Sequence, residues 1–181
     1  MTNPLSKRLS EGNVHLMPFI DDYIEPLRAA YEQDQDIWEI YPQCMIGEYF
    51  EAGFGAFYKH YLIGDWAGFA IFDSDELVGL TNFIDFDSRN GVVEIGGTYI
   101  TPSARGTGLN RVMKRLMIEH AFDCGYRRIE FRVDLRNKRS QAAVLKLGAQ
   151  YEGTLRKNKI TWTGHIRDTM VFSLLQDEWA G

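Results

Sequence analysis

The sequence predicts an α+β domain built on a mixed β-sheet. Three observations support this class: short runs with strand-like alternation, one long stretch with helical periodicity, and an order of strands first, then helix–strand–helix–strand–strand. A chain of 181 residues with 45% hydrophobic and 25% charged residues fits one compact domain. We therefore expect a single domain over residues 1–181, with its core at about 14–179 and an N-terminal tail at 1–13.

The first hundred residues predict mostly strands. The expected elements are a strand at 14–20, a helix carrying Leu27, Ala30 and Tyr31, a helical region at 46–61, strands at 66–72 and 76–85 around the turn 73–75, a hairpin turn at 88–91, and a strand at 92–100. Asp21 and Asp22 are placed to cap the first helix. The aromatic residues between 38 and 58 belong either to the core or to a flap that binds a substrate.

The second half carries the clearest helical pattern. Apolar residues recur at Leu109, Val112, Met113, Leu116 and Met117, and the polar face is expected to hold Asn110, Arg111, Lys114, Arg115 and Glu119. Gly125 is a plausible stop. A strand at 128–134 follows, then a short helix from an Asn137 cap to Leu147 and Gly148, and an antiparallel pair at 149–156 and 166–174.

The segment between the strand 92–100 and the long helix predicts an anion-binding loop. It reads Arg105-Gly106-Thr107-Gly108-Leu109-Asn110. Glycines let several backbone N–H groups converge, and the helix N-terminus adds partial positive charge. The chain has no G-x-x-x-x-G-K-[ST] pattern, and no third glycine completes G-x-G-x-x-G. A phosphorylated ligand of another kind is therefore expected here.

Read as Arg105, Gly108 and Asn110, this loop resembles the Q/R-x-x-G-x-G/A pyrophosphate loop of the GNAT superfamily of acyl-CoA-dependent acetyltransferases, with Asn110 departing from the last position. Later motifs follow the order of its RimJ/RimL branch: Asn137-Lys138-Arg139-Ser140, Leu147-Gly148-Ala149, Glu152-Gly153-Thr154-Leu155-Arg156, Arg167-Asp168-Thr169-Met170 and Glu178-Trp179. The resemblance covers roughly Val14 to Trp179. It implies the GNAT fold, with a mixed, mostly antiparallel sheet of about seven strands flanked by about four helices.

The resemblance also implies acetyl-CoA as co-substrate and direct attack of an amine on it, without an acyl-enzyme. It assigns the pantetheine arm to backbone groups of Thr98, Tyr99 and Ile100, the pyrophosphate to the backbone of Arg105, Gly106, Thr107, Gly108, Leu109 and Asn110, and a pantetheine contact to Asn137. For Asn137 a plain helix cap is the alternative interpretation, and both roles are compatible.

Ser140 is the candidate residue for protonating the leaving thiolate. Many GNAT enzymes carry a general-acid Tyr seven residues after this Asn, but that position is Val144 here. In RimL-like enzymes a serine at the position of Ser140 is proposed to protonate the thiolate. The alternatives are a water molecule, or a first-turn hydroxyl that only bonds its own backbone.

Glu94 is the leading candidate for the general base. Strand alternation would place Glu94, Gly96 and Thr98 on one face, where a partly desolvated carboxylate accepts a proton, through water, from an ammonium group. Asp85 is the second candidate. An exposed strand carboxylate without a catalytic role is the alternative for either.

Charge and composition exclude several classes. The net charge of −5 argues against general nucleic-acid binding, and 17 Asp and Glu against five Lys and Arg in residues 1–100 contrast with eight against 15 afterwards. A basic CoA-binding half and an acidic half for a cationic amine would explain this partition, and so would chance. The scattered histidines and cysteines predict no metal site and no disulfide, and no apolar leader or membrane span is evident.

These observations predict a cytoplasmic N-acetyltransferase, monomeric or homodimeric, whose acceptor is a primary amine. The α-amino group of a protein or peptide is the first choice, by family analogy. The alternatives are a small-molecule amine such as an aminoacyl conjugate, a polyamine or an antibiotic, and a non-catalytic acyl-CoA-binding module. A nucleic-acid-binding protein that shares the fold is a third possibility. The sequence does not distinguish acetyl-CoA from propionyl-CoA or a longer acyl-CoA as the donor.

Overall fold

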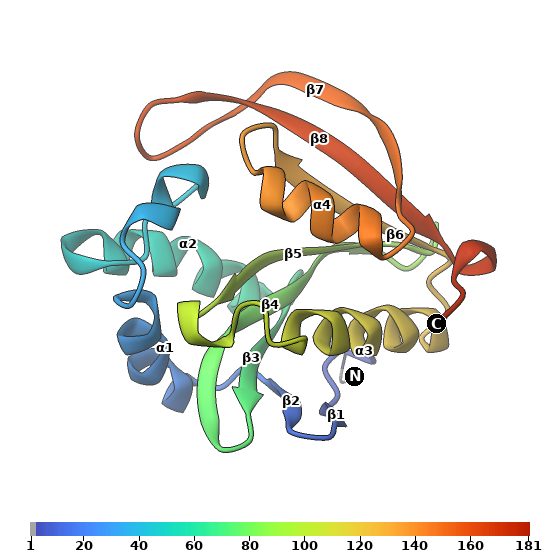
Figure 1. Ribbon diagram of the computed structural model, residues 1–181, viewed down its shortest axis with the longest axis horizontal. Helices are drawn as coiled ribbons and strands as arrows, with labels where there is room; N and C mark the ends of the chain where they lie inside the picture. Colours follow the sequence, from blue (N-terminus) through green and yellow to red (C-terminus); the bar gives the residue numbers. More distant parts are fainter. Residues whose placement is uncertain (1–2) are drawn as a thin grey trace.

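The computed structural model describes residues 3–181 as a single twisted sheet flanked by helices (Figure 1). The sheet order is β1-β2-β3-β4-β5-β6-β8-β7. Its strands are β1 Leu9–Glu11, β2 Val14–Pro18, β3 Ala67–Asp73, β4 Glu76–Asp87, β5 Val92–Ile100, β6 Arg128–Asp134, β7 Gln150–Ile160 and β8 Ile166–Leu175. The helices are α1 Ile24–Tyr31, α2 Phe50–Ile63, α3 Leu109–Asp123 and α4 Lys138–Lys146. The predicted α+β fold is confirmed, with eight strands where about seven were expected.

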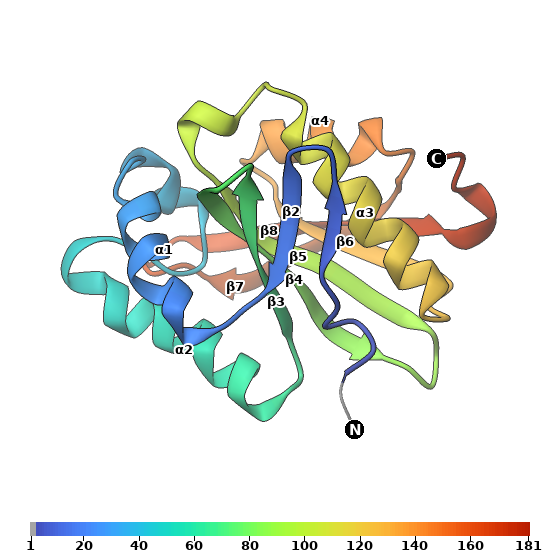
Figure 2. The same ribbon diagram turned by 90° about the horizontal axis from the view of Figure 1, so that it is seen from below.

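Two apolar clusters fill the space on the two faces of the sheet. The helix α3 and the buried Val144 of α4 pack in one cluster with Val93, Ile95 and Ile129 of the central strands. The helices α1 and α2 pack in the other, which is largely aromatic. Figure 2 shows α1 and α2 together on one flank and α3 on the other. The aromatic residues Trp38, Phe50, Phe54 and Phe57 are buried, so they belong to the core.

The expected N-terminal tail packs against the core from residue 3 onward, while residues 1–2 lie outside the described part. Leu5 is fully buried, and its carbonyl oxygen lies 3.2 Å from His120 Nε2 on α3. Strand β1 pairs antiparallel with β2. The sequence gives no periodic signal here, because a three-residue strand is too short to show alternation.

The predicted cap of α1 is absent, and the predicted cap of α4 is present. Asp21 and Asp22 lie in a short 3-10 turn, α1 begins at Ile24 without a side-chain cap, and Asp21 instead accepts a hydrogen bond of 2.9 Å from the Tyr58 hydroxyl. In α4 the predicted cap is confirmed, because Asn137 Oδ1 accepts from the Ser140 N–H at 3.0 Å.

Strand β5 changes its pairing midway. Its parallel register with β6 covers only Val92 to Glu94, although both strands continue beyond that point. Its antiparallel register with β4 shifts by one residue after Gly96, and Gly97 takes a φ of +57°. This is a β-bulge, which bends the strand and needs the left-handed conformation that glycine adopts most easily. The far half of β5 therefore leaves β6 and continues to the loop before α3.

Among residues 3–181, no helix combines the length and the apolar character that crossing a membrane requires.

Candidate active site

The bulge in β5 separates two residues that were expected to share a face. Thr98 Oγ1 lies 2.8 Å from Thr81 Oγ1. The Thr81 hydroxyl also contacts the sulfur of Met117 on α3, so Thr98 faces that helix. Glu94 lies on the opposite face, where Arg132 Nε approaches its carboxylate at 3.3 Å. The prediction that Glu94 and Thr98 point to the same side is therefore wrong, because one extra residue reverses the alternation along the strand.

Glu94 has the environment expected of a general base. Its side chain is 14% exposed, and it sits where the β5–β6 pairing ends. Burial raises its pKa to about 7, although Arg132 and Lys159 pull in the opposite direction. A Cβ at Gly96 would lie 2.8 Å from Glu94 Oε1, so the glycine leaves the space that the carboxylate occupies. Such a group is half ionised near neutral pH and is suited to proton transfer.

Asp85, the second candidate base, differs from Glu94 in exposure. It lies in an irregular part of β4 with a φ of +46°, and its side chain is exposed. Its charge acts on Glu94 by raising the pKa of that carboxyl.

The loop before α3 has the shape of a phosphate cradle. Gly106 and Gly108 take φ values of +79° and +96°, and α3 begins directly afterwards at Leu109. The N–H groups of Gly106, Gly108 and Asn110 donate to none of the residues in the described range. Free amides at a helix N-terminus bind anions well. The residues present therefore fit a pyrophosphate.

Arg105 has a different part in this loop from the one predicted. Its backbone N–H donates to the Pro102 carbonyl at 3.2 Å, so it is not free for a phosphate. Its guanidinium forms an ion pair with Asp34, donates to the Ile100 carbonyl at 2.8 Å, and lies 5.6 Å from the centre of the Tyr99 ring. Arg105 thus fixes the corner between β5 and the loop.

The three residues assigned to the pantetheine arm all have internal contacts. The Tyr41 hydroxyl donates to the Thr98 carbonyl, and Arg105 donates to the Ile100 carbonyl. Tyr99 is buried, with its hydroxyl donating to the Ala30 carbonyl at 2.9 Å. A carbonyl oxygen has a second lone pair, so these contacts leave Thr98 and Ile100 able to accept from a ligand as well.

Tyr41 belongs to the aromatic residues between 38 and 58, but its contact with β5 was not predicted from the sequence. It follows the 3-10 turn Asp36–Ile40 and packs against Trp38 with 5.0 Å between ring centres. Burial raises its pKa to about 12, with Arg139 of α4 and Arg105 acting in the opposite direction. The phenol therefore stays protonated at neutral pH and is a hydrogen-bond donor between β5 and the start of α4. No sequence pattern marks it, since it comes from an irregular segment.

The turn from β6 into α4 is held by Asp134. This buried carboxylate accepts from the Arg136 backbone N–H at 2.8 Å and from its guanidinium at 2.9 Å. Burial alone would raise its pKa, but the hydrogen bonds from Arg136 keep it below the ordinary value. Gln141 Nε2 donates to the Leu135 carbonyl at 2.8 Å. These contacts fix the helix start that carries Asn137 and Ser140.

Ser140 and Asn137 lie in the first turn of α4, half-buried, while Val144 is buried in the core. Asn137 Oδ1 is used as the helix cap, as the alternative interpretation required. The placement of Val144 excludes that position as the site of a proton donor. Ser140 stays a candidate for protonation of the leaving group, because its hydroxyl donates to no described residue.

Lys114 also lies in a different place from the one predicted from the sequence. The helical pattern put it on the polar face of α3, but its side chain is buried, and Nζ donates to Thr98 Oγ1 at 2.9 Å. Burial lowers its pKa to about 7, and the charge of Glu94 raises it. The pattern failed because the bulge turns a polar threonine toward α3 and creates a polar position inside an apolar face.

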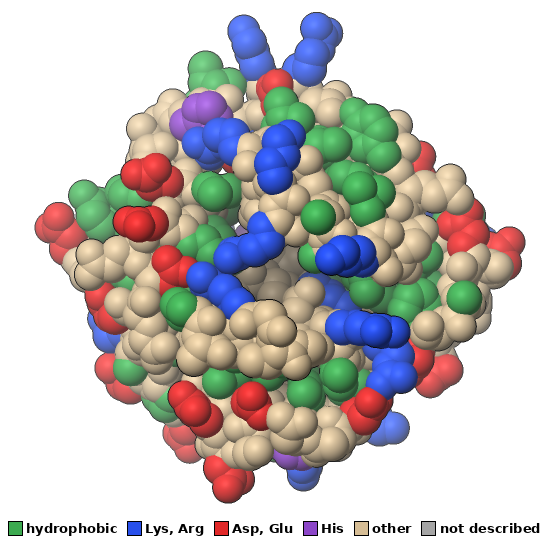
Figure 3. Space-filling model, in the orientation of Figure 1, with side chains coloured by type: hydrophobic (Ala, Val, Ile, Leu, Met, Phe, Trp, Pro, Cys, Tyr) green, Lys and Arg blue, Asp and Glu red, His purple; other side chains and the backbone are tan. Residues whose placement is uncertain are grey.

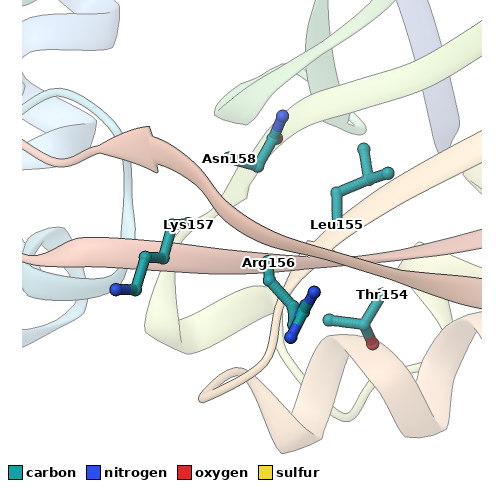
Figure 4. Close-up of a pocket in the computed structure, with 5 residues that line it drawn as sticks. All are labelled: Thr154, Leu155, Arg156, Lys157 and Asn158. Carbon is teal, nitrogen blue, oxygen red and sulfur yellow. The ribbon is translucent and has the colours of Figure 1, made fainter.

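A hollow opens over this region. Figure 3 shows Lys and Arg side chains around a depression at the centre of the face seen in Figure 1. A cavity of about 680 Å³ lies along β7, lined by Thr154, Leu155, Arg156, Lys157 and Asn158. Figure 4 shows these side chains fanning out to both sides of the strand.

Strand β7 bulges beside this cavity. Its register with β8 shifts between Leu155 and Lys159, and Lys157 takes a φ of +51°. The Lys157 N–H donates to Asp168 Oδ1 at 2.7 Å, which stabilises the bulge. Among residues 3–181, no group of three or more His, Cys, Asp and Glu side chains is arranged to hold a metal ion.

A family model and a curated relative match this chain in sequence. Residues 13–150 match the model of the acetyltransferase (GNAT) domain. The chain is 32% identical over 110 residues to the uncharacterized N-acetyltransferase p20 of Bacillus licheniformis; the match covers 60% of this chain and 61% of that relative. The chain thus spans about three fifths of the length of that curated relative.

Solved structures agree over nearly the whole chain. A probable GNAT-family acetyltransferase from Chromobacterium violaceum is 30% identical, with a TM-score of 0.87 over 97% of this chain and 94% of the other. The Mycobacterium smegmatis RimJ structure, in complex with CoA-disulfide, shares the fold at 18% identity, with a TM-score of 0.85 over 100% of this chain and 93% of that one. The fold, the loop before α3 and the matched family model lead to one conclusion: this chain belongs to the GNAT family of acetyltransferases.

Proposed function

We propose that the protein is an N-acetyltransferase that uses acetyl-CoA and transfers the acetyl group directly to a primary amine. The first choice of acceptor is the α-amino group of a protein or peptide, by analogy with the RimJ/RimL branch. The observation that carries the proposal is the placement of Glu94. A carboxyl group whose pKa is near 7 lies where β5 leaves β6, on the strand that leads into the phosphate-binding loop.

Acetyl-CoA supplies an activated carbonyl and a thiolate leaving group. In the proposed mechanism, Glu94 accepts a proton from the acceptor ammonium, directly or through water, and so produces the neutral amine that attacks. The amides of Gly106, Thr107, Gly108 and Asn110 hold the pyrophosphate, while the Leu109 N–H donates to Thr107 Oγ1 within the loop. Carbonyls of Thr98 and Ile100 orient the pantetheine arm, with Asn137 nearby. As the new C–N bond forms and the C–S bond breaks, the Ser140 hydroxyl gives its proton to the leaving thiolate and recovers one, through water, from the acetylated nitrogen.

Two other functions make different predictions. A transferase for a small-molecule amine would use the same Glu94 chemistry but ignore peptides. A non-catalytic acyl-CoA-binding module would bind acetyl-CoA without any turnover that depends on Glu94. Arg156 and Lys157 line the cavity along β7, so an acceptor that enters there has to tolerate positive charge.

The test is release of free thiol from acetyl-CoA by the purified protein across N-terminal peptides, polyamines and aminoacyl compounds. We expect one acceptor class to raise release above slow hydrolysis, and Glu94→Gln to abolish that increase while acetyl-CoA still raises the melting temperature. Glu76→Gln, at an exposed position at the start of β4, is the matched control and should keep the wild-type rate. Stabilisation by acetyl-CoA without turnover of any acceptor would favour the binding module. No stabilisation by any acyl-CoA would contradict the proposal.

A further inference from the structure

Lys114 is the most unusual charged residue of the chain. It lies in the second turn of α3, only 7% exposed, among the apolar side chains that join α3 to the sheet. Its ammonium group donates one hydrogen bond, to Thr98 Oγ1 at 2.9 Å. No ion pair within residues 3–181 includes it. A lysine in such a place is rare, because lysines are almost never fully buried unless they are paired.

This burial costs folding free energy. Moving an ammonium ion out of water is unfavourable, and a single neutral hydroxyl compensates only in part. The long side chain of a lysine on a helix surface normally reaches solvent and keeps its charge there. Lys114 instead points toward the sheet, so packing alone does not account for a lysine at this position.

The contact of Lys114 lies at the bulge of β5. Thr98 is the first residue after Gly97, and it is held from both sides. Tyr41 donates to its carbonyl oxygen, and Lys114 donates to its hydroxyl, which is also paired with Thr81. The backbone that carries the proposed pantetheine carbonyls is therefore positioned from α3 by Lys114.

Lys114 also acts on the general base from the other face of the strand. No hydrogen bond or ion pair joins it to Glu94, yet the Glu94 carboxylate raises the pKa of Lys114, while burial lowers it to about 7. By reciprocity a positive charge at Lys114 favours the ionised form of Glu94. The charged groups that act most on the pKa of Glu94 are Arg132 and Lys159, which lower it, and Asp85 and Glu130, which raise it.

We propose that Lys114 is a positioning residue of the active site, whose buried ammonium fixes Thr98 at the bulge of β5 and so holds the backbone that carries the proposed pantetheine carbonyls. The inference rests on the proposed transferase function. It assigns a role to a group that neither the phosphate loop nor the acid–base pair uses, and it explains why the fold retains a costly buried charge.

The first test is Lys114→Met, which removes the charge and keeps the length of the side chain. We expect kcat/KM to fall about tenfold or more, with acetyl-CoA affinity changed less than about threefold. The acidic limb of the pH profile should move to higher pH, since Glu94 loses a positive neighbour and its pKa rises. Lys114→Gln, which keeps a donor for Thr98 without the charge, should show the same shift of the limb with a smaller loss of rate.

A second measurement needs no substrate. Because the pKa of Lys114 is lowered in the folded state, the unfolded chain binds more protons between about pH 7 and pH 10, where free lysine titrates. Stability from this group therefore rises with pH over that range. Lys114→Met should raise the melting temperature most at pH 6, and the gain should shrink toward pH 10. Lys59→Met, at an exposed position on α2, is the control for both measurements.

The outcomes separate the two proposals. If the wild type acetylates an acceptor and Lys114→Met has the same rate and the same acidic limb of the pH profile, this inference alone is overturned. A melting temperature that falls in Lys114→Met at every pH would also overturn it, because the residue would then be a structural contact. Absence of turnover by the wild type with every acceptor would contradict the proposed function and this inference together.

Discussion

The two halves of β5 are built in different ways. Residues 92–95 pair with β4 on one side and mostly with β6 on the other, and Val93 and Ile95 are buried in the apolar cluster under α3. Residues 97–100 pair only with β4, and side chains from distant segments hold their polar groups. One half is fixed by the sheet and the other by Tyr41, Lys114 and Arg105. The difference suggests that stability and site geometry depend on different residues of the same strand.

The largest effect should come from Glu94→Gln, at the boundary between the two halves. Loss of the base should lower kcat/KM by about 10²–10⁴-fold, the usual contribution of general base catalysis. In the wild type, kcat/KM should rise with pH through about 7 as Glu94 loses its proton, and this rise should disappear in the variant. Steady-state rates between pH 5.5 and 8.5 check both points. A variant with the wild-type rise would exclude Glu94 as the base.

Ile95→Ala tests the half fixed by the sheet. Removing most of a buried side chain should lower the free energy of unfolding by about 2–5 kcal/mol, measured by urea denaturation. At a temperature where the variant is folded, its dissociation constant for acetyl-CoA should stay within about twofold of the wild type. A large loss of affinity in a folded variant would show that the two halves are not independent.

Arg105→Met tests the half held by side chains. The change leaves Asp34 without its ion-pair partner and the Ile100 carbonyl without its donor, so we expect a cost of about 1–3 kcal/mol in stability. Because Arg105 fixes the corner before the phosphate loop, the dissociation constant for acetyl-CoA should also rise several-fold. Isothermal titration calorimetry measures this rise. If Arg105→Met loses the expected stability but keeps its affinity for acetyl-CoA, the corner does not position the phosphate loop.

Tyr41→Phe should give the smallest effect. It removes one hydrogen bond to the Thr98 carbonyl, which is worth about 1 kcal/mol, and keeps the ring packed against Trp38. We expect a melting temperature lower by a few degrees and a modest fall in kcat. Differential scanning calorimetry with a parallel rate assay checks it. A loss as large as that of Glu94→Gln would instead give Tyr41 a direct part in the reaction.

The sequence predicted the fold well where periodicity is strong. The apolar face of α3, the strand at 128–134 and the Asn137 cap all agree with the structure. Prediction failed where one residue breaks a period. Strand alternation could not anticipate the bulge at Gly97, so it placed Thr98 beside Glu94, and the helical pattern then placed Lys114 in solvent.

Contacts between distant segments left no local signal. Tyr41 reaches Thr98 across 57 positions of the chain, and Arg105 reaches Asp34 across 71. The first-turn placement of Asn137 and Ser140 was predictable because one short helix carries both. The roles assigned to the loop amides, Glu94 and Ser140 stay predictions until the variants are measured.

The hairpin of β7 and β8 has one further consequence, for how this protein can change over generations. Its tip is tied to the N-terminal half by Trp162, whose indole donates to the Trp38 carbonyl at 2.8 Å. Between that tie and Thr154, the side chains of β7 are exposed, so most replacements there alter stability by less than about 0.5 kcal/mol. The exposed side chains of residues 155–160 can therefore vary at little cost to the fold, apart from Lys157, whose φ is +51°, and Lys159, whose charge acts on Glu94.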